Sequence, residues 1–137
     1  MRKYNLPLTY PPKIPKVKSG ECTQTIRVKM RREYKVGDFV SFHGWKGVPY
    51  HSPWSFRTPY WELLEVIPIA FTDEGIYCTP EGRAKSIVYY WWELDNLARL
   101  DGIDPPTGSR LGYLLTSMHN PPPEGVLAQI LRWDFKE

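Results

Sequence analysis

The stretch SGECTQTIR (residues 19–27), followed ten residues later by GDFV (residues 37–40), decides the fold expected of this chain. Gly20 can adopt the left-handed backbone conformation that ends a helix, so it predicts a helix stop after residues 15–18. Residues 23–28 are typical of the strand that follows. The polar part of the stretch therefore lies at a helix-to-strand junction, where it forms one wall of a small binding cleft.

The strand predicted after this junction carries a polar face. Because side chains alternate along a strand, Thr23, Thr25 and Arg27 share one face. Such a row can hydrogen-bond a phosphate, a carboxylate or the edge of a base, and arginine offers a planar fork that lysine lacks. On periodicity alone, the row is also explained by a half-buried strand with a solvated polar face.

The spacing Gly20-x-Cys22-x-x-x-x-Arg27 resembles the G-x-K-x-x-x-x-R signature of ASCH domains, members of the PUA-like superfamily, with Cys22 in place of the lysine. The block LARLDGI (residues 97–103) is similar to the family's helical segment, and QILRW (residues 129–133) is similar to its final strand. Together the three blocks cover nearly the whole chain. The resemblance implies an α+β fold, a small open mixed β-barrel of the PUA-like type with flanking short helices.

Length and composition agree with one soluble domain. A chain of 137 residues has the size of one ordinary domain, residues 1–137, built around one core. No run of about 18 apolar residues is present to span a bilayer, and the N-terminal residues lack the apolar stretch of a secretory signal. We therefore expect a soluble, cytoplasmic protein with no membrane partner.

Cysteine and histidine usage suggests neither a disulfide framework nor a metal site. Cys22 and Cys78 lie in no C-x-x-C or C-x-x-H pattern. His43, His51 and His119 are scattered without the spacing of metal ligands. We expect no metal and no cofactor.

Charge is divided unevenly along the chain. Residues 1–60 hold 12 Lys and Arg against 3 Asp and Glu, a charge of +9, whereas residues 61–137 hold 6 against 12, a charge of −6. The basic half could follow a phosphate backbone if its side chains share one face. The alternative is that the two halves neutralise each other within one domain. The residues that carry the first interpretation are Lys13, Lys16, Lys18, Arg27, Lys29, Arg31, Arg32, Lys35, Lys46 and Arg57.

Aromatic side chains are unusually frequent, with 5 Phe, 6 Trp and 9 Tyr making 15% of the chain. They gather in residues 50–61 and 89–92, and we expect the majority of these rings to fill the barrel. Trp54 and Arg57 differ, because they lie in a Gly- and Pro-punctuated loop, residues 44–57, where rings alternate with cations. A base could stack on Trp54 while Arg57 holds the adjacent phosphate. The alternative is a packed Ω-loop.

Apolar runs and turn residues predict the remaining elements. A proline-rich leader comes first, and a long hairpin over residues 71–92 looks like an insertion that extends the cleft or makes a partner surface. Its exposed edge suggests a homodimer. In full, the pattern predicts a leader over residues 6–15, strands over 38–44, 61–69, 71–79, 84–92 and 126–133, a turn at 80–83, and helices over 93–101 and 110–118.

A nucleic-acid-binding module is the favoured function. ASCH domains resemble RNA-binding PUA domains, which implies a cleft that accepts RNA or a nucleotide. Single-stranded RNA is the expected partner, because side chains cannot read the major groove of A-form RNA. The predicted ligand-binding residues are Gly20, Cys22, Thr23, Thr25, Arg27, Trp54 and Arg57.

Two alternatives remain. Some small bacterial ASCH proteins are amidohydrolases that deacetylate N4-acetylcytidine with a lysine, a threonine and a glutamate. The resemblance assigns the threonine to Thr25 and the acid to Asp101, but the lysine position holds Cys22. A cysteine with an ordinary pKa of about 8.5 is mostly a neutral thiol at pH 7, so this substitution weighs against the same chemistry. Cys22 is then either a nucleophile or a small buried residue. The third possibility is a protein-interaction module with an unused cleft, suggested by the hairpin and the proline-rich residues 116–124.

Overall fold

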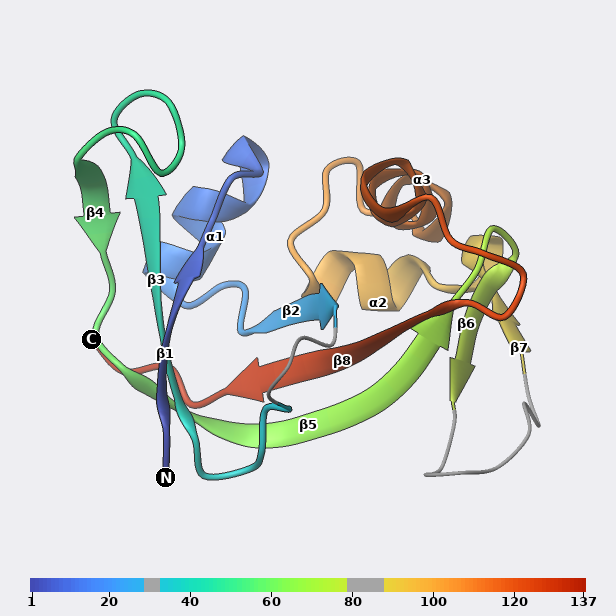
Figure 1. The fold of residues 1–137 in the computed structure, drawn as a ribbon, viewed down its shortest axis with the longest axis horizontal. Coiled ribbons are helices and arrows are strands. Elements are labelled where there is room, and N and C mark those ends of the chain that lie inside the picture. Colours follow the sequence, from blue (N-terminus) through green and yellow to red (C-terminus); the bar gives the residue numbers. More distant parts are fainter. Residues whose placement is uncertain (29–32, 79–87) are drawn as a thin grey trace.

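A computed structural model describes residues 1–28, 33–78 and 88–137. One short helical segment follows the first strand, six described strands come next, and the other described helices precede the last strand (Figure 1). In chain order the described elements are β1 (Lys3–Pro7), η1 (Pro11–Lys13), α1 (Ile14–Ser19), β2 (Gln24–Val28), β3 (Phe39–Trp45), β4 (Trp54–Arg57), β5 (Trp61–Phe71), β6 (Gly75–Cys78), β7 (Val88–Tyr90), η2 (Trp91–Glu93), α2 (Asp95–Leu100), α3 (Gly108–His119) and β8 (Val126–Trp133), where η denotes a 3-10 helix.

The strands form one curved sheet organised around β5, which runs along most of its length (Figure 1). The start of β5 pairs with β3 and the rest pairs with β8, with a shift of register between Leu63 and Glu65. β8 then pairs with β2, β3 with β1 and β4, and β6 with β5 and β7. β1 and β3 are parallel, and the other pairings of the described strands are antiparallel. The protein is therefore α+β, with an open, mostly antiparallel sheet of eight described strands and few short helices.

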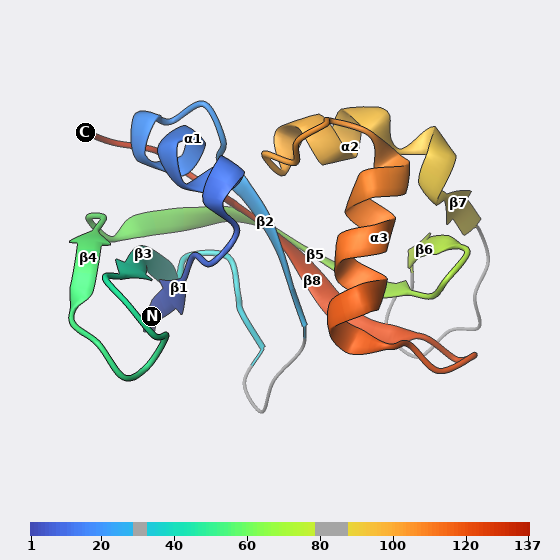
Figure 2. The same cartoon turned by 90° about the horizontal axis from the view of Figure 1, so that it is seen from above.

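The helices lie on one side of the sheet in two groups, α1 apart from α2 and α3 (Figures 1 and 2). Each group covers its own apolar cluster. The first cluster lies around Phe42, Leu63 and Leu131, and the second lies around Phe71, Trp91 and Leu111. Burial of these side chains from water is the main force that holds each helix group on the sheet. The seam between the two clusters is where η1, β2 and the end of α2 meet.

Several predicted elements agree with the structure. α1 ends before Gly20, whose φ of 84° is the left-handed conformation that the sequence predicts. A Cβ at Gly20 would lie 2.6 Å from the Phe135 ring, so packing as well as backbone geometry requires glycine there. β2 begins one residue later than predicted, and β8 has the predicted bounds.

Other predictions about the bounds of strands and loops were wrong. The proline-rich leader overlaps β1, because Lys3–Pro7 pairs in register with β3. The loop expected over residues 44–57 ends in β4, which pairs with β3 at the sheet edge. The strand expected over residues 84–92 stops at Tyr90, because Tyr90 is the N-cap of η2 and donates its amide hydrogen bond to the Glu93 side chain.

Some predictions fall outside the described residues. These are the turn at residues 80–83, the first part of the strand at 84–92, and the basic side chains Lys29, Arg31 and Arg32.

Candidate active site

Lys13 is the centre of a polar cluster at the seam between the two halves of the protein. It ends η1, a turn whose first positions are prolines with a fixed backbone angle. Its side chain is buried, with 5% of the residue exposed. The Nζ atom donates one hydrogen bond to Thr25 Oγ1 at 3.0 Å and another to Asp101 Oδ2 at 3.2 Å. Lysine is almost never buried so deeply unless it is paired, so these two contacts define its position.

Asp101 reaches the cluster from the end of α2. The next residue, Gly102, has a φ of 74°, and a Cβ there would lie 3.2 Å from Lys13 Cγ. Glycine thus turns the chain and leaves room for the lysine. The second carboxylate oxygen of Asp101 accepts a hydrogen bond from Gln24 Nε2 at 3.4 Å. Burial raises the pKa of Asp101, while the charge and hydrogen bond of Lys13 and the hydrogen bond of Gln24 oppose that rise.

Thr25 and Arg27 occupy the same face of β2, as the alternation predicts, but they meet different groups. Thr25 is buried against Lys13, whereas Arg27 Nη2 donates a hydrogen bond to the Pro7 carbonyl at 2.8 Å. Burial lowers the pKa of Arg27, and its Nε is a buried donor with no hydrogen-bond partner among the described atoms. Thr23 precedes the strand and is half-buried. Arg27 therefore ties the end of β1 to β2 instead of standing free for a ligand.

Cys22 is fully buried beside the cluster, with 1% of the residue exposed. Its Sγ lies within hydrogen-bond distance of the carbonyl oxygens of Gln24 at 3.2 Å and Leu100 at 3.4 Å, and its single S–H donates to one of them at a time. Burial raises the pKa of the thiol, and the Lys13 charge only partly opposes this. Both Cys22 Sγ and Lys13 Cγ lie within 3.3 Å of the position that a Gly102 Cβ would take. The Lys13 side chain therefore lies beside Cys22, which occupies the position where the motif that this sequence resembles has a lysine.

The cluster joins an amine, a hydroxyl and a carboxylate in a site that is nearly closed to water. Such a set can hold and move a proton at the hydroxyl oxygen, and the low local dielectric strengthens each interaction. The same contacts also tie η1 to β2 and α2. The geometry alone is compatible with a catalytic role of Lys13, Thr25 and Asp101 and with a structural one.

Trp54 and Arg57 lie in β4, at the sheet edge, and are not among the contacts of the Lys13 cluster. The Trp54 ring stacks on His43 with a centroid distance of 4.1 Å and an angle of 19° between planes. Arg57 lies 5.6 Å from the centre of the Trp54 ring and also donates a hydrogen bond to the Tyr60 hydroxyl at 2.9 Å. Trp54 thus already contacts a ring and a cation of its own chain.

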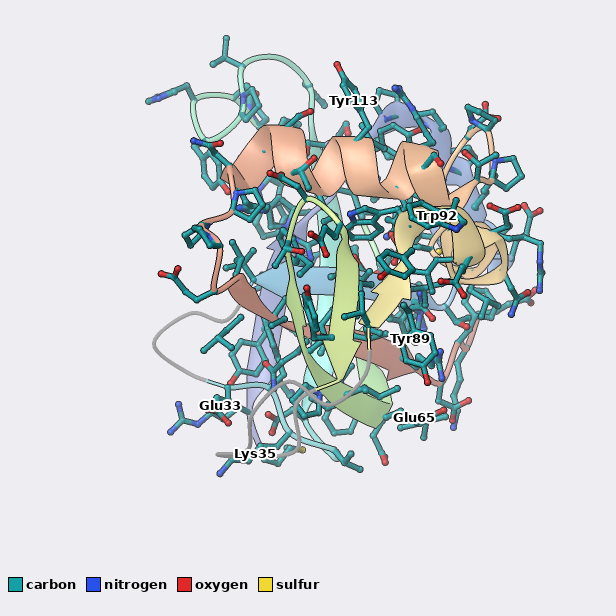
Figure 3. All side chains as sticks on the ribbon, turned by 90° about the vertical axis from the view of Figure 1, so that its right-hand side faces the viewer. Glu33, Lys35, Glu65, Tyr89, Trp92 and Tyr113 are labelled. Atoms are coloured by element: carbon teal, nitrogen blue, oxygen red, sulfur yellow. The ribbon has the colours of Figure 1, made fainter. Side chains whose placement is uncertain are left out.

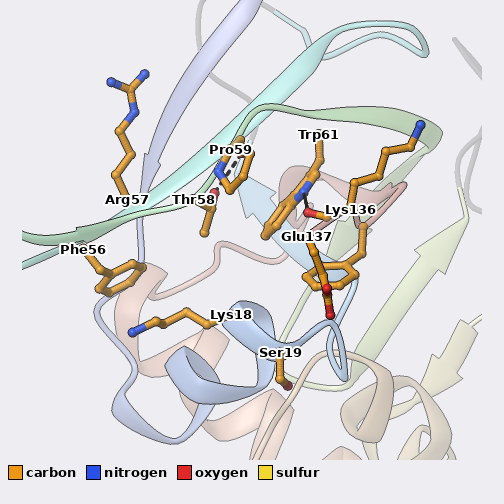
Figure 4. Close-up of a pocket in the computed structure, with 10 residues that line it drawn as sticks. Lys18, Ser19, Phe56, Arg57, Thr58, Pro59, Trp61, Lys136 and Glu137 are labelled. Atoms are coloured by element: carbon orange, nitrogen blue, oxygen red, sulfur yellow. Dashed lines mark hydrogen bonds between the residues drawn. The ribbon is translucent and has the colours of Figure 1, made fainter.

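A pocket of about 380 Å³ opens between α1, the segment after β4 and the last residues of the chain (Figure 4). We call it the α1–β4 pocket; Lys18, Phe56, Arg57, Trp61 and Lys136 are among its lining residues. Lys18 Nζ lies 5.0 Å from the centre of the Phe56 ring. Trp61 Nε1 donates a hydrogen bond to the Lys136 carbonyl at 2.8 Å. The pocket therefore combines cations with aromatic rings, and of the predicted ligand-binding residues only Arg57 is among its lining residues.

Sequence reasoning missed the role of Lys13, which it counted only among the basic residues. No motif spacing points to this lysine, because it lies nine positions before Cys22 in the proline-rich leader. The sequence contains one local signal that could have pointed to Lys13. This residue is a cation directly between Pro12 and Ile14, in a turn that the prolines hold close to the sheet. The approach of Asp101, which is 88 positions away along the chain, had no local signal at all.

Within residues 1–28, 33–78 and 88–137, no three His, Cys, Asp or Glu side chains gather as they would around a metal ion. In the same part of the chain, no helix is both long and apolar enough to cross a membrane. No protein-family model matches the chain, and neither a curated protein nor a solved structure matches it.

Proposed function

We propose that this protein is a hydrolase of amide bonds, with Thr25, Lys13 and Asp101 as its reacting groups. One observation carries the proposal: Lys13 Nζ lies 3.0 Å from Thr25 Oγ1 and 3.2 Å from Asp101 Oδ2. The ASCH resemblance implies a lysine, a threonine and an acid, and Cys22 was the reason to doubt that set. Lys13 supplies the missing amine from another segment, so the objection raised by Cys22 no longer holds.

The proton route follows from the three contacts. In the proposed reaction one proton first moves from Lys13 to Asp101, whose carboxyl takes a proton more readily because burial raises its pKa, and this leaves an amine and a carboxylic acid without exchange with solvent. The amine can then accept the Thr25 proton while the hydroxyl oxygen attacks the amide carbon, as in lysine-activated hydroxyl nucleophiles. Return of that proton to the leaving nitrogen releases the amine product. Water then hydrolyses the acyl ester on Thr25.

The substrate proposed for this site is small. The exposed fractions are 5% for Lys13, 4% for Thr25 and 5% for Asp101, which leaves little room for a polypeptide. An acyl group on the exocyclic amine of a nucleobase has the required size, and the basic first half of the chain suits a nucleotide. N4-acetylcytidine is therefore the first substrate to test, in agreement with the ASCH resemblance.

The experiment is to incubate the purified protein with N4-acetylcytidine and measure cytidine and acetate by liquid chromatography. We expect hydrolysis by the parent protein and a loss of at least about 100-fold in Thr25→Val, which keeps the shape of the side chain but removes the hydroxyl. Cys22→Ala is the matched control, because it alters a buried neighbour that has no part in the proton route. Circular dichroism and thermal unfolding must show that each variant is folded.

A relocation variant makes the test sharper. Lys13→Met should abolish turnover, and adding Cys22→Lys should restore part of it, because the two side chains run past the same glycine. If a folded parent protein hydrolyses no acylated nucleoside, the proposal fails. If Thr25→Val is as active as the parent, or if Cys22→Ala alone removes activity, the assignment of the nucleophile is wrong.

Recognition of single-stranded RNA or a nucleotide is a second candidate function, favoured by the α1–β4 pocket. Lys18 lies against the Phe56 ring inside the pocket, and Arg57, which also lines the pocket, lies against the Trp54 ring on β4 outside it; this pairing of cations and rings suits a base and its phosphate. Fluorescence anisotropy with short single-stranded RNA at low and moderate salt tests this candidate. Arg57→Ala should weaken binding, and Arg99→Ala, an exposed arginine on α2, is the control for a general loss of charge. If Arg57→Ala and Arg99→Ala weaken RNA binding equally, the protein binds RNA only through a nonspecific basic surface.

A further inference from the structure

A groove between η2 and α3 has no part in the functions proposed above. It measures about 640 Å³, and Asp73, Glu74, Tyr90, Trp92 and Tyr113 are among its lining residues. We call it the η2–α3 groove. Figure 3 shows this side of the protein, with Tyr113 on one side of α3 and Trp92 on the other. The groove lies in the second half of the chain, on a different group of elements from the Lys13 cluster.

The walls of the groove are exposed aromatic rings. Trp92 is 66% exposed, Tyr113 is 61% exposed and Tyr90 is 38% exposed. Tyr90 and Trp92 stack on each other with a centroid distance of 4.6 Å and an angle of 3° between planes, so they present a preformed flat surface. Rings so exposed contribute little to the core, and an exposed aromatic patch of this kind marks an interaction site.

The floor of the groove is rigid. Trp91 is buried, and its Nε1 donates a hydrogen bond to the Thr72 carbonyl at 3.0 Å. A Cβ at Gly112 would lie 2.5 Å from the Trp91 ring, so α3 rests directly on this ring. The rings above are therefore attached to elements that are locked together, which lowers the entropy lost when a ligand binds.

The charged residues that line the groove indicate which kind of ligand it can bind. Asp73 and Glu74 are exposed carboxylates in its lining, and its other lining residues carry no basic group. Arg110 brings one positive charge nearby, with its guanidinium 5.4 Å from the centre of the Tyr113 ring. Carboxylates repel phosphate, so this groove suits a cation rather than a nucleic acid. Aromatic faces with adjacent carboxylates are the usual environment of a guanidinium or an ammonium.

We propose that the η2–α3 groove binds an arginine side chain of a partner polypeptide. The planar guanidinium stacks on the Tyr90–Trp92 surface and donates hydrogen bonds to the carboxylates of Asp73 and Glu74. Arginine fits better than lysine, because the surface is flat and the two acids accept a fork of donors. The protein itself uses this contact twice, between Arg110 and Tyr113 and between Arg57 and its ring neighbours.

The test is a titration of the whole protein with a blocked peptide that contains two arginines separated by glycine, followed by tryptophan fluorescence and by NMR. A peptide with citrulline in place of arginine has the same shape without the charge. Residues 61–137, which hold the groove, carry a net charge of −6, so some general attraction of a basic peptide is expected, and a lysine peptide of the same charge measures it. We expect the arginine peptide to bind at least tenfold more tightly than the citrulline peptide.

Two groups of variants locate the binding. Trp92→Ala should weaken the arginine peptide about 5- to 10-fold, and Asp73→Asn with Glu74→Gln should weaken it further and reduce its dependence on salt. These side chains are exposed, so the fold should be unaffected. Trp54→Ala, an exposed ring on β4, is the control and should have no effect. Equal binding of the citrulline peptide, equal binding of a lysine peptide, or no effect of Trp92→Ala would each overturn the proposal.

Discussion

Replacing Lys13 by methionine should destabilise the protein in a way that depends strongly on pH. Methionine keeps most of the buried stem but removes the cation that faces Asp101. The side chains of this pair are each 7% exposed, so water cannot replace the lost partner. Breaking a buried ion pair by removing one partner costs about 3–5 kcal/mol. The remaining hydrogen bond from Gln24, at 3.4 Å, is too long to offset much of that cost.

The sign of the pH dependence follows from the Asp101 carboxyl. Burial already raises its pKa, and removal of Lys13 removes the largest influence that lowers it. A group whose pKa is higher in the folded state than in the unfolded state binds its proton more tightly when folded. The Lys13→Met variant should therefore be most stable at low pH, and it should lose stability as the pH rises through the folded-state pKa of Asp101.

The assay is urea unfolding followed by tryptophan fluorescence between pH 4 and pH 8. The double variant Lys13→Met with Asp101→Leu removes both charges, so it should recover most of the lost free energy and have no such pH dependence. A loss of less than about 1 kcal/mol in Lys13→Met at pH 7 would mean that the pair is solvated. That result would refute the reasoning. So would a double variant whose loss of unfolding free energy equals the sum of the losses in the two single variants.

Three further measurements test other parts of the structure. Burial, aided by nearby arginine charges, lowers the pKa of His43, so the unfolded state takes up the proton first; stability in urea should fall as the pH drops below about 6.5, and less so in His43→Gln. Gly112→Ala should cost about 1–3 kcal/mol in urea unfolding, because its Cβ meets the Trp91 ring at 2.5 Å, whereas Gly47→Ala, with a nearest contact of 3.6 Å, should be nearly neutral. Cys22 should react with a thiol reagent only as fast as the protein unfolds, since it is 1% exposed and burial raises its pKa; rapid reaction in the native state would contradict its position in the core.

Local patterns explain the elements that sequence alone could predict. Gly20 ends α1 because the left-handed conformation is a property of that single residue and its neighbours. The alternation that puts Thr25 and Arg27 on one face of β2 is likewise fixed by strand geometry. β8 has the predicted bounds because an apolar run between turn residues needs no knowledge of its partner.

Elements that depend on a distant partner could not be predicted in this way. β1 lies within a proline-rich stretch that has little strand propensity, and it forms because β3 offers a free edge. β4 pairs with β3, the strand directly before it in the chain, although the sequence of β4 is typical of a loop. Pairing energy from the partner strand outweighs local preference at both edges.

The sequence by itself determined the helix end at Gly20 and the alternation that puts Thr25 and Arg27 on one face of β2. Only the tertiary structure decided which amine completes the cluster. Thr25 reaches the lysine of the proline-rich turn, not a residue at the motif position, because Cys22 and Gly102 leave space that the Lys13 stem fills. Motif spacing specifies neighbours along one strand, whereas a buried charge is positioned by whichever oppositely charged or polar groups surround it, however far apart they lie in the chain.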